Sequence, residues 1–271
     1  MMAAITAARR GKSVAILERM NKPGKKILAT GNGKCNFTNN NMDTSRFHGN
    51  IQLIQSVLDR FSKEDTLSFF HEIGIWPKEK NGYYYPNSGQ AASVVEAFNH
   101  ELNRLHVPVY LEQEVLDLFP DKYGFRIKTV QTSYTCRNVI VASGLLAASK
   151  LGSDGSMFSV IKELGHRFVP VLPALCGFYA KGIQFSKVAG VRCDANLTLK
   201  IDGDTATTEH GELQLTDYGI SGIPVFQISS PAVRALYEKK TVAVAIDFLP
   251  EISSEMLCTC LLYTSDAADD G

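Results

Sequence analysis

The sequence predicts an α/β protein in which a domain of helices and parallel strands is interrupted by a second domain rich in β-strands. Two observations lead to this prediction. A helix-favouring stretch followed at once by a short apolar strand stands at the N-terminus, and the same succession returns near residue 105. After residue 168 the composition shifts toward short apolar runs separated by glycine, proline and aspartate, which is typical of antiparallel strands and turns.

The N-terminal segment has the pattern of the second half of a dinucleotide-binding βαβ unit. Residues 2–10 are rich in alanine, Gly11 is placed as a helix stop, and residues 14–17 form an apolar strand that ends at Glu18. In such a unit a glycine-rich turn precedes the helix, and an acid about 20 residues later binds ribose hydroxyls. Counting back from Glu18 passes Met1, so we expect the first strand and its glycines upstream of a truncated chain. Any β–α protein contains a similar stretch, and that interpretation stays open.

A lysine- and glycine-rich segment follows at residues 22–39. Gly31 and Gly33 permit positive φ and let backbone N–H groups approach a ligand closely. Three lysines lie among them, which suits a diphosphate: Lys25, Lys26 and Lys34. The alternative is an ordinary solvated polar loop, and the spacing alone barely favours binding.

Helices and a tyrosine-rich strand are predicted next. The periodicity is helical from Ile51 to Phe61, and Ser62 with Asp65 forms a capping box that opens a second helix ending at Gly74. The three adjacent tyrosines of residues 83–86 would alternate between the faces of a strand, so at most one face could serve a ligand. We interpret this segment as a core or edge strand rather than a binding platform.

A helix, a three-stranded meander and a returning strand are predicted between residues 91 and 144. The helix covers about 91–105, and strands follow at 107–111, 115–119, 125–130 and 134–136. Residues 139–144 have the pattern of a buried strand that ends in a small-residue turn, and a helix over about 157–164 comes after it. This order is typical of two-dinucleotide flavoproteins, in which the meander covers the adenine side of the sheet.

Three segments are expected along the chain: a Rossmann-type domain over 1–167, an incomplete β-rich domain over 168–255, and a tail over 256–271. Strands of the second domain are predicted at 169–173, 195–201, 212–215, 219–222 and 242–248. The tail resembles translated sequencing adapter, so we expect it to be non-native.

Composition limits the function classes. The 271 residues carry 28 Lys+Arg against 28 Asp+Glu, so there is no general surplus of cations for nucleic acid or an acidic membrane, although a local basic patch is not excluded. The six cysteines form no Cys-x-x-Cys pair, which predicts reduced thiols in the cytoplasm and no metal site. The longest uncharged run, residues 218–233, contains two glycines and two prolines, unlike a membrane helix.

Three segments together resemble a bacterial family of FAD-dependent oxidoreductases that includes dehydro-bile-acid reductases and proteins labelled aminoacetone oxidases. They are residues 7–19, the segment 24–39 with its Thr-Gly-Asn-Gly-Lys-Cys-Asn string, and residues 211–222. The resemblance covers the chain from Met1 to about Glu255. It implies a Rossmann-type FAD-binding domain, of the two-dinucleotide-binding flavoprotein architecture, with an inserted β-rich domain and a small helical piece.

The resemblance also implies a cofactor site. Glu18 would bind the adenosine ribose, the segment from Lys26 to Asn36 would lie along FAD, and the backbone of Val115 would touch adenine. The full set of expected FAD contacts is Glu18, Arg19, Lys26, Gly31, Gly33, Lys34, Cys35, Asn36, Val115, Ser143 and Gly144. Leu145 stands where the family usually has a second glycine. Without the glycine-rich turn and the segment that lines the flavin, we expect the chain alone to bind little or no FAD.

The function implied is reduction of a small unsaturated or carbonyl substrate, with NADH or NADPH passing hydride to FAD. This agrees with the absence of any Ser-His-Asp, Cys-His or paired-carboxylate arrangement, because the cofactor carries the hydride chemistry. No catalytic residue can be named. Cys35 is interpreted as a packed thiol rather than a redox group. The alternatives are a non-catalytic FAD-binding protein or redox sensor and, third, a flavin-dependent tRNA-modifying enzyme, which would need a basic surface.

Overall fold

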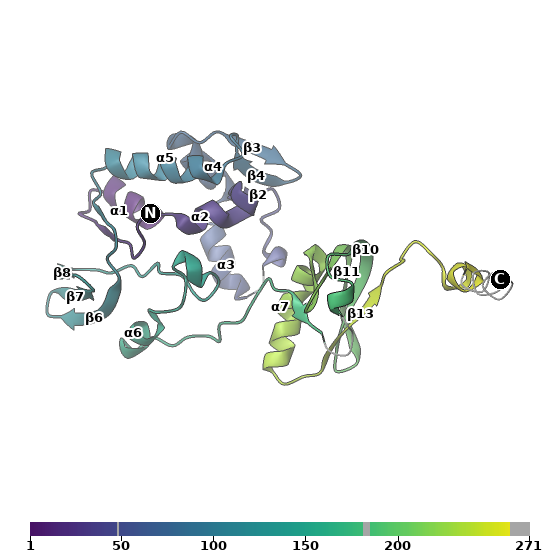
Figure 1. Cartoon of the computed structure of the whole chain (residues 1–271). Helices are drawn as coiled ribbons and strands as arrows, with labels where there is room; N and C mark the ends of the chain where they lie inside the picture. Colours follow the sequence, from purple (N-terminus) through teal and green to yellow (C-terminus); the bar gives the residue numbers. More distant parts are fainter. Residues whose placement is uncertain (48, 181–184, 261–271) are drawn as a thin grey trace. The chain divides into compact units, whose positions relative to one another are not determined.

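The chain folds into two units, Met1–Phe168 and a second unit that begins at Val169 (Figure 1). The computed structural model describes residues 1–47, 49–180 and 185–260. Residues 261–271 of the expected non-native tail lie outside these ranges, and residues 254–260 before them are helical. Each unit is treated by itself below.

Six α-helices and eight strands are described in the first unit. The helices are α1 (Met2–Arg9), α2 (Lys25–Ala29), α3 (Ile51–Leu58), α4 (Lys63–Glu72), α5 (Ala91–Arg104) and α6 (Phe158–Glu163). Short 3₁₀ turns are η1 (Thr30–Gly33), η2 (Thr44–Arg46) and η3 (Ser149–Leu151). The strands are β1 (Ile16–Leu17), β2 (Thr38–Asn39), β3 (Pro77–Lys80), β4 (Tyr83–Pro86), β5 (Val109–Tyr110), β6 (Val115–Asp121), β7 (Gly124–Thr129) and β8 (Ser133–Cys136).

The helix ends follow the capping residues predicted from the sequence. The Ser62 hydroxyl accepts from Asp65 N at 3.1 Å, and Ser62 N donates to the Asp65 carboxylate at 2.8 Å, which confirms the capping box of α4. Gly74 follows α4 with φ of +88°, and Gly11 follows α1 with φ of +69°. Both glycines adopt the left-handed conformation that terminates helices.

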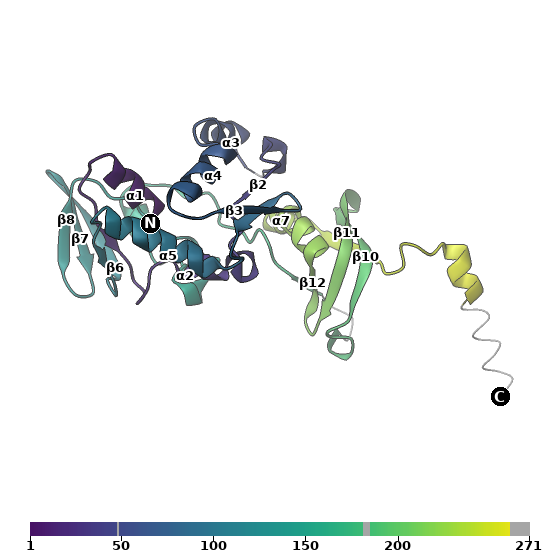
Figure 2. The same ribbon diagram turned by 90° about the horizontal axis from the view of Figure 1, so that it is seen from above.

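Three small sheets form the strand part of the first unit. β1 pairs in parallel with β5, joining Ile16 to Val109 and Leu17 to Tyr110. The antiparallel meander β6–β7–β8 confirms the three predicted strands, and β2–β4–β3 contains the tyrosine-rich strand. Figure 2 shows α1 and α2 beside α5, with the meander to one side of this layer within the unit.

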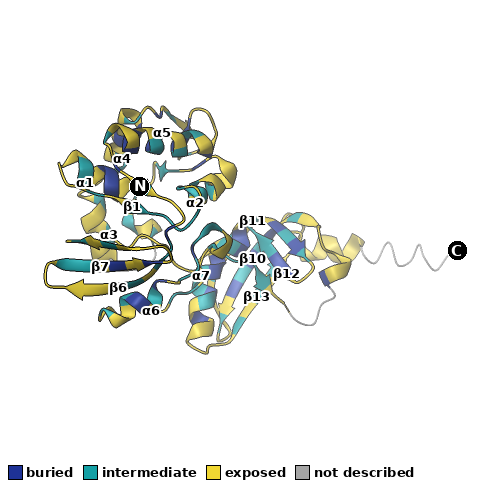
Figure 3. Cartoon of the chain, turned by 60° about the vertical axis from the view of Figure 1, so that its left-hand side comes forward, coloured by how far each residue is buried: buried dark blue, intermediate teal, exposed yellow. Residues whose placement is uncertain are grey.

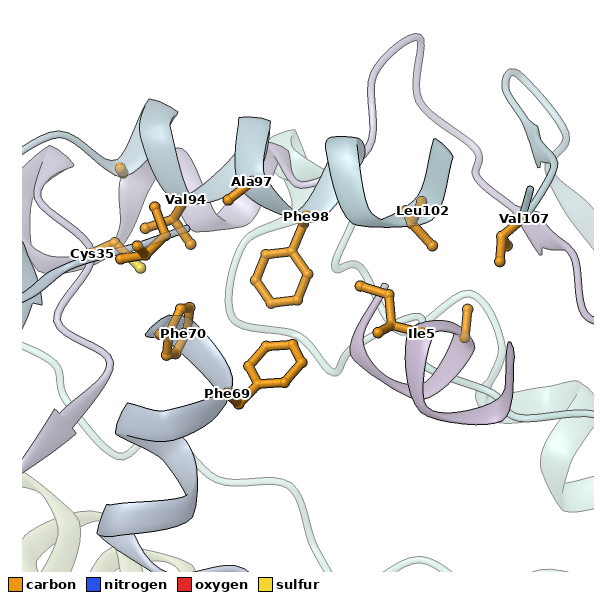
Figure 4. Packing of buried hydrophobic residues seen from close by; sticks show 12 residues of the cluster. Ile5, Cys35, Phe69, Phe70, Val94, Ala97, Phe98, Leu102 and Val107 are labelled. Carbon is orange, nitrogen blue, oxygen red and sulfur yellow. The ribbon is translucent and has the colours of Figure 1, made fainter. Parts of the chain in front are cut away.

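The core of the first unit lies where α1, α4 and α5 meet (Figure 4). Phe98 of α5 contacts Phe69 and Phe70 of α4, with ring centroids 5.9 and 6.0 Å apart. Ile5 of α1 and Leu102 of α5 are also fully buried. The predicted apolar stripe of α5 is confirmed by the burial of Phe98 and Leu102, because side chains three and four residues apart share a helix face.

The expected buried strand at residues 139–144 is wrong: the segment forms no strand. Ile140 is 70 % exposed and Val141 is exposed as well. A buried parallel strand needs a hydrogen-bonded neighbour, and among the described residues the parallel sheet consists of β1 and β5 only. The apolar pattern is therefore present without the pairing that would bury it.

The second unit is an antiparallel sheet in the order β13–β10–β11–β12–β9, packed on one helix. Its elements are β9 (Phe178–Tyr179), η4 (Phe185–Lys187), β10 (Arg192–Ile201), β11 (Asp204–Thr216), β12 (Gly219–Gly222), α7 (Ile223–Tyr237) and β13 (Val242–Asp247). Leu197, Leu199 and Leu213 of the sheet are completely buried with Val225 and Ile228 of α7. Figure 3 shows buried residues in dark blue on β10, β11 and α7.

Helix α7 was not expected in a unit predicted to be mostly β. It begins inside the uncharged run 218–233, whose prolines argue against a helix by residue type alone, and continues to Tyr237. Pro224 stands in the first turn, where its missing N–H has no intrahelical partner to lose. Pro231 is inside the helix, which the burial of one apolar face maintains. The strand expected at 169–173 is also absent.

Two negative findings concern the residues with described positions. None of their helices combines the length and apolar character needed to span a membrane. Nor do three or more of their His, Cys, Asp and Glu side chains gather in a way that could hold a metal ion.

Candidate functional site

Glu18 lies directly after β1, at the carboxyl end of the parallel strand pair. Its backbone N–H donates to Tyr110 O at 2.9 Å, and its carbonyl accepts from Gln113 N at 2.9 Å. One carboxylate oxygen, Oε1, accepts from Met20 N at 2.8 Å. The strand pairing therefore fixes the backbone on both sides of Glu18, and the turn at Met20 orients its carboxylate. In α/β sheets ligands bind at this carboxyl end of the strands.

The charge of Glu18 acts on the amino group at the start of α1. Burial lowers the pKa of the Met1 amino group, and the negative charge of nearby Glu18 opposes part of that effect. Met1 is the N-cap residue of α1 and forms no side-chain hydrogen bond with the first turn of the helix.

The predicted segment 26–36 is more ordered than a polar loop, since α2 and η1 cover most of it. It begins beside α1: a Cβ placed on Gly24 would lie 3.5 Å from the sulfur of Met1. Gly31 has φ of +55°, and a Cβ there would come within 2.7 Å of Asn36 N. The turn at Gly31 therefore requires glycine for both conformation and space. Lys26, Gly33 and Lys34 are exposed.

Cys35 is a packed thiol, as predicted. It is only 7 % exposed and belongs to the aromatic core of the first unit (Figure 4). Burial raises the pKa of the Cys35 thiol, and a hydrogen bond with Thr30 opposes this effect in part. A thiol with a raised pKa and little exposed surface is a poor nucleophile at neutral pH. Its side chain anchors the segment, and contact with a ligand would fall to its backbone.

Arg19 is held by two carboxylates. Its Nη1 lies 2.8 Å from Asp154 Oδ2 and 3.4 Å from Glu114 Oε1. The hydrogen bond from Arg19 lowers the pKa of Asp154 to about 2, and Ser156 N contributes a further hydrogen bond. Arg19 therefore joins the end of β1 to the start of β6 and to the turn after η3.

The same ion pairs bring the remaining predicted residues to the end of β1. Val115 is the first residue of β6 and directly follows Glu114. Gly144 has φ of +81°, and a Cβ there would lie only 2.2 Å from Ser153 Oγ, next to Asp154. Ser143 is exposed beside it. The segments that contain Glu18, Arg19, Val115 and Gly144 therefore meet in one region.

Two groups important to this region were missed in the sequence: Asp154 and Ser153. Ser153 Oγ donates to Leu145 O at 3.0 Å, and its backbone pairs with Ala148, so the turn closes on itself. The sequence contains a pattern that could have indicated them, since Gly152 to Ser156 is a run of glycine, serine and aspartate that favours a tight turn.

A parallel strand that ends at an acid, beside the start of a helix, defines a Rossmann-type nucleotide-binding arrangement. The chain belongs to the family described as the HI0933-like protein Rossmann domain, whose model matches residues 1–242. This match confirms the predicted α/β fold class with its Rossmann-type domain, and the family resemblance.

Curated relatives match nearly all of this chain but only part of their own length. A 3-dehydro-bile acid delta(4,6)-reductase from Clostridium scindens is 43 % identical over 260 residues, which are 95 % of this chain and 64 % of that protein. Two ribosomal RNA dihydrouridine synthases, from Haemophilus influenzae and Escherichia coli, are 29 % and 27 % identical over 94 % of this chain. The match covers 63 % and 62 % of those proteins, so the chain spans less than two thirds of each relative.

Proposed function

We propose that the whole protein that contains this chain is an FAD-dependent reductase that saturates a carbon–carbon double bond conjugated with a carbonyl group. The single observation that carries the proposal is the position of Glu18 directly after β1, at the carboxyl end of the parallel pair β1–β5, where Tyr110 and Gln113 hold its backbone. A carboxylate at this end of parallel strands provides the partner that the ribose hydroxyls of a nucleotide cofactor need.

The names of the relatives support the type of reaction. A delta(4,6)-reductase of a 3-dehydro bile acid reduces double bonds conjugated with a ketone, and a dihydrouridine synthase saturates a double bond conjugated with a carbonyl of uracil. Both reactions add a hydride equivalent and a proton across an activated double bond. FAD, when bound, supplies this hydride chemistry.

The residues of this chain bind and orient the cofactor in this proposal. Glu18 accepts hydrogen bonds from the ribose, and the exposed lysines Lys26 and Lys34 offset phosphate charge. Gly31 and Gly33 let the backbone of their turn approach the cofactor, with Asn36 at the end of the segment. The backbone of Val115 contacts adenine, and the turn at Ser143 and Gly144 closes the same end of the site.

The set of residues fits the cofactor chemically. Glu18 accepts hydrogen bonds, as ribose hydroxyls require, and the exposed Lys26 and Lys34 provide the positive charge that a diphosphate requires. Arg19 is already paired with Asp154 and Glu114, so we assign it to holding the site together rather than to neutralising phosphate.

The proposal names NADH or NADPH as the electron donor and a small enone as the substrate. Anaerobic addition of either nucleotide to the whole flavin-loaded protein should bleach the flavin absorbance, and an enone should then restore it. No bleaching with either nucleotide would overturn the reductase. Bleaching that only oxygen or a partner protein reverses would favour a redox sensor.

A uridine in RNA is the second candidate substrate, because two of the relatives are named for it. Reoxidation of the reduced flavin by RNA but not by a small enone would favour it. We also propose a cytoplasmic location, because thiols such as Cys35, Cys136, Cys176 and Cys193 form no disulfide.

A further inference from the structure

One face of the β3–β4 hairpin carries lysine and aromatic side chains. β3 pairs with β4 so that Lys78 is opposite Tyr85 and Lys80 is opposite Tyr83. Residues directly opposite each other in an antiparallel pair point to the same side of the sheet. Trp76, which precedes β3 and whose carbonyl accepts from Asn87 N, continues the alternation. We call Trp76, Lys78, Lys80, Tyr83 and Tyr85 the hairpin face.

Burial shows that the hairpin face is the outer one. Ile75 and Pro86 alternate with its residues on the other side, and both are buried in the first unit. On the hairpin face itself, Trp76 is 67 % exposed and Tyr83 is 45 % exposed. Trp76 is the only tryptophan of the chain. Large aromatic side chains are usually buried, so an exposed one on a surface with a second exposed ring indicates a binding surface.

The charge on the hairpin face is positive. Lys78 and Lys80 are exposed, and neither forms an ion pair with any residue of the described ranges. The neighbouring acid, Glu79, is on the opposite face, where its carboxylate accepts from Gly82 N. The zero net charge of the whole chain therefore coexists with a local patch in which Lys78 and Lys80 lie beside the exposed rings of Trp76 and Tyr83, with the half-buried Tyr85 next to them.

The shape of this patch selects the kind of ligand. Four residues of extended strand separate Trp76 from Lys80, a distance of about 13 Å, so rings and cations are spread over a flat array rather than gathered in a pocket. A free small ligand needs a concave site. Flat alternation of rings and cations suits a strand of nucleic acid, whose bases stack and whose phosphates repeat along the chain.

We propose that the hairpin face binds single-stranded RNA. The hairpin face lies next to the candidate site, because a Cβ placed on Gly31 would lie 3.6 Å from the ring of Tyr85. RNA bound on this face would therefore be near the cofactor segment. The inference rests on the proposed function in one respect, since it gives the second candidate substrate a docking surface. Binding requires no turnover, so it can succeed or fail independently of the reductase.

The test measures binding of a fluorescent single-stranded oligouridylate of about 12 nucleotides to the full chain. We expect binding that weakens with salt and that quenches Trp76. Lys78→Gln with Lys80→Gln should weaken binding about tenfold and lower the salt slope by about 1.4, the value for two phosphate contacts on a single strand. Trp76→Ala should cost about tenfold, while Trp76→Phe retains most of the affinity.

A matched control lies on the β6–β7 turn, where Lys122 is 5.3 Å from the ring of Tyr123, which is 78 % exposed. Lys122→Gln with Tyr123→Ala removes one lysine and one exposed aromatic ring from another surface and should leave RNA binding unchanged. An equal loss in this control would show general electrostatics and overturn the proposal. Absence of RNA binding at low salt, or quenching of Trp76 by NADPH but not by RNA, would also overturn it.

Discussion

Glu101 offers the sharpest test of how the first unit is held together. Its side chain is 6 % exposed on α5, where it accepts from Arg9 Nε of α1 at 2.8 Å and from Arg104 Nε at 2.6 Å. Arg9 also pairs with the exposed Glu72 of α4 at 2.7 Å. Glu101→Gln keeps the size of the side chain and removes the charge that links α1 to α5.

The expected loss follows from the pKa of Glu101. Hydrogen bonds from Arg104 and then Arg9 lower this pKa to about 2 from the usual 4.5. A shift of that size corresponds to at most ~3.4 kcal/mol. Because Arg104 is 65 % exposed and solvent screens its charge, we expect Glu101→Gln to lower the free energy of unfolding by about 2 kcal/mol.

Denaturant unfolding followed by circular dichroism and by Trp76, which lies in the first unit, measures this loss. The exposed pair is the control: Glu72→Gln should cost less than about 1 kcal/mol. A lowered folded-state pKa stabilises above the unfolded value, so the difference between wild type and Glu101→Gln should be complete above about pH 5 and disappear as pH falls toward 2. Equal losses in the two variants, or a difference independent of pH, would refute the reasoning.

Three further predictions concern other parts of the chain. Asp154→Asn should release the turn after η3 and speed the amide hydrogen exchange of that turn at neutral pH. Because the pKa of Asp154 is lowered to about 2 from the usual 3.8, the exchange rates of wild type should approach those of the variant only as pH falls from 3.8 toward 2. Gly31→Ala should lower the melting temperature, at a cost of at least ~1 kcal/mol, because φ is +55° and Asn36 N blocks the new Cβ. Leu197→Ala should destabilise the second unit by about 2–5 kcal/mol in denaturant unfolding, and a loss below ~1 kcal/mol would contradict its complete burial.

Local rules in the sequence were sufficient where neighbouring residues decide the structure. The capping box at Ser62 and the stop at Gly74 depend on contacts a few residues apart along the chain, and the meander β6–β8 pairs strands that follow each other directly in the sequence. Residues 139–144 and helix α7 depend on distant partners instead. The apolar run 139–144 pairs with no strand among the residues that the structure describes. Helix α7 forms despite Pro231 because burial of its apolar face on the sheet outweighs propensity.

In the candidate site, too, local sequence patterns predicted some features, and contacts between distant residues decided the others. The position of Glu18 after a parallel strand followed from the pattern of residues 14–18. The pairing of Arg19 with Asp154 joins residues 135 positions apart, and no local pattern contains that information. The assignment of the other cofactor contacts stays a prediction.

The affinity of the whole protein for FAD, compared between wild type and Glu18→Gln, tests the central claim most directly. We predict a loss of ~1–3 kcal/mol by fluorescence titration, the range for hydrogen bonds to a charged group. Glu96→Gln, an exposed acid on α5, should leave the affinity unchanged. Equal FAD affinity in wild type and Glu18→Gln would remove Glu18 from the site and contradict the account.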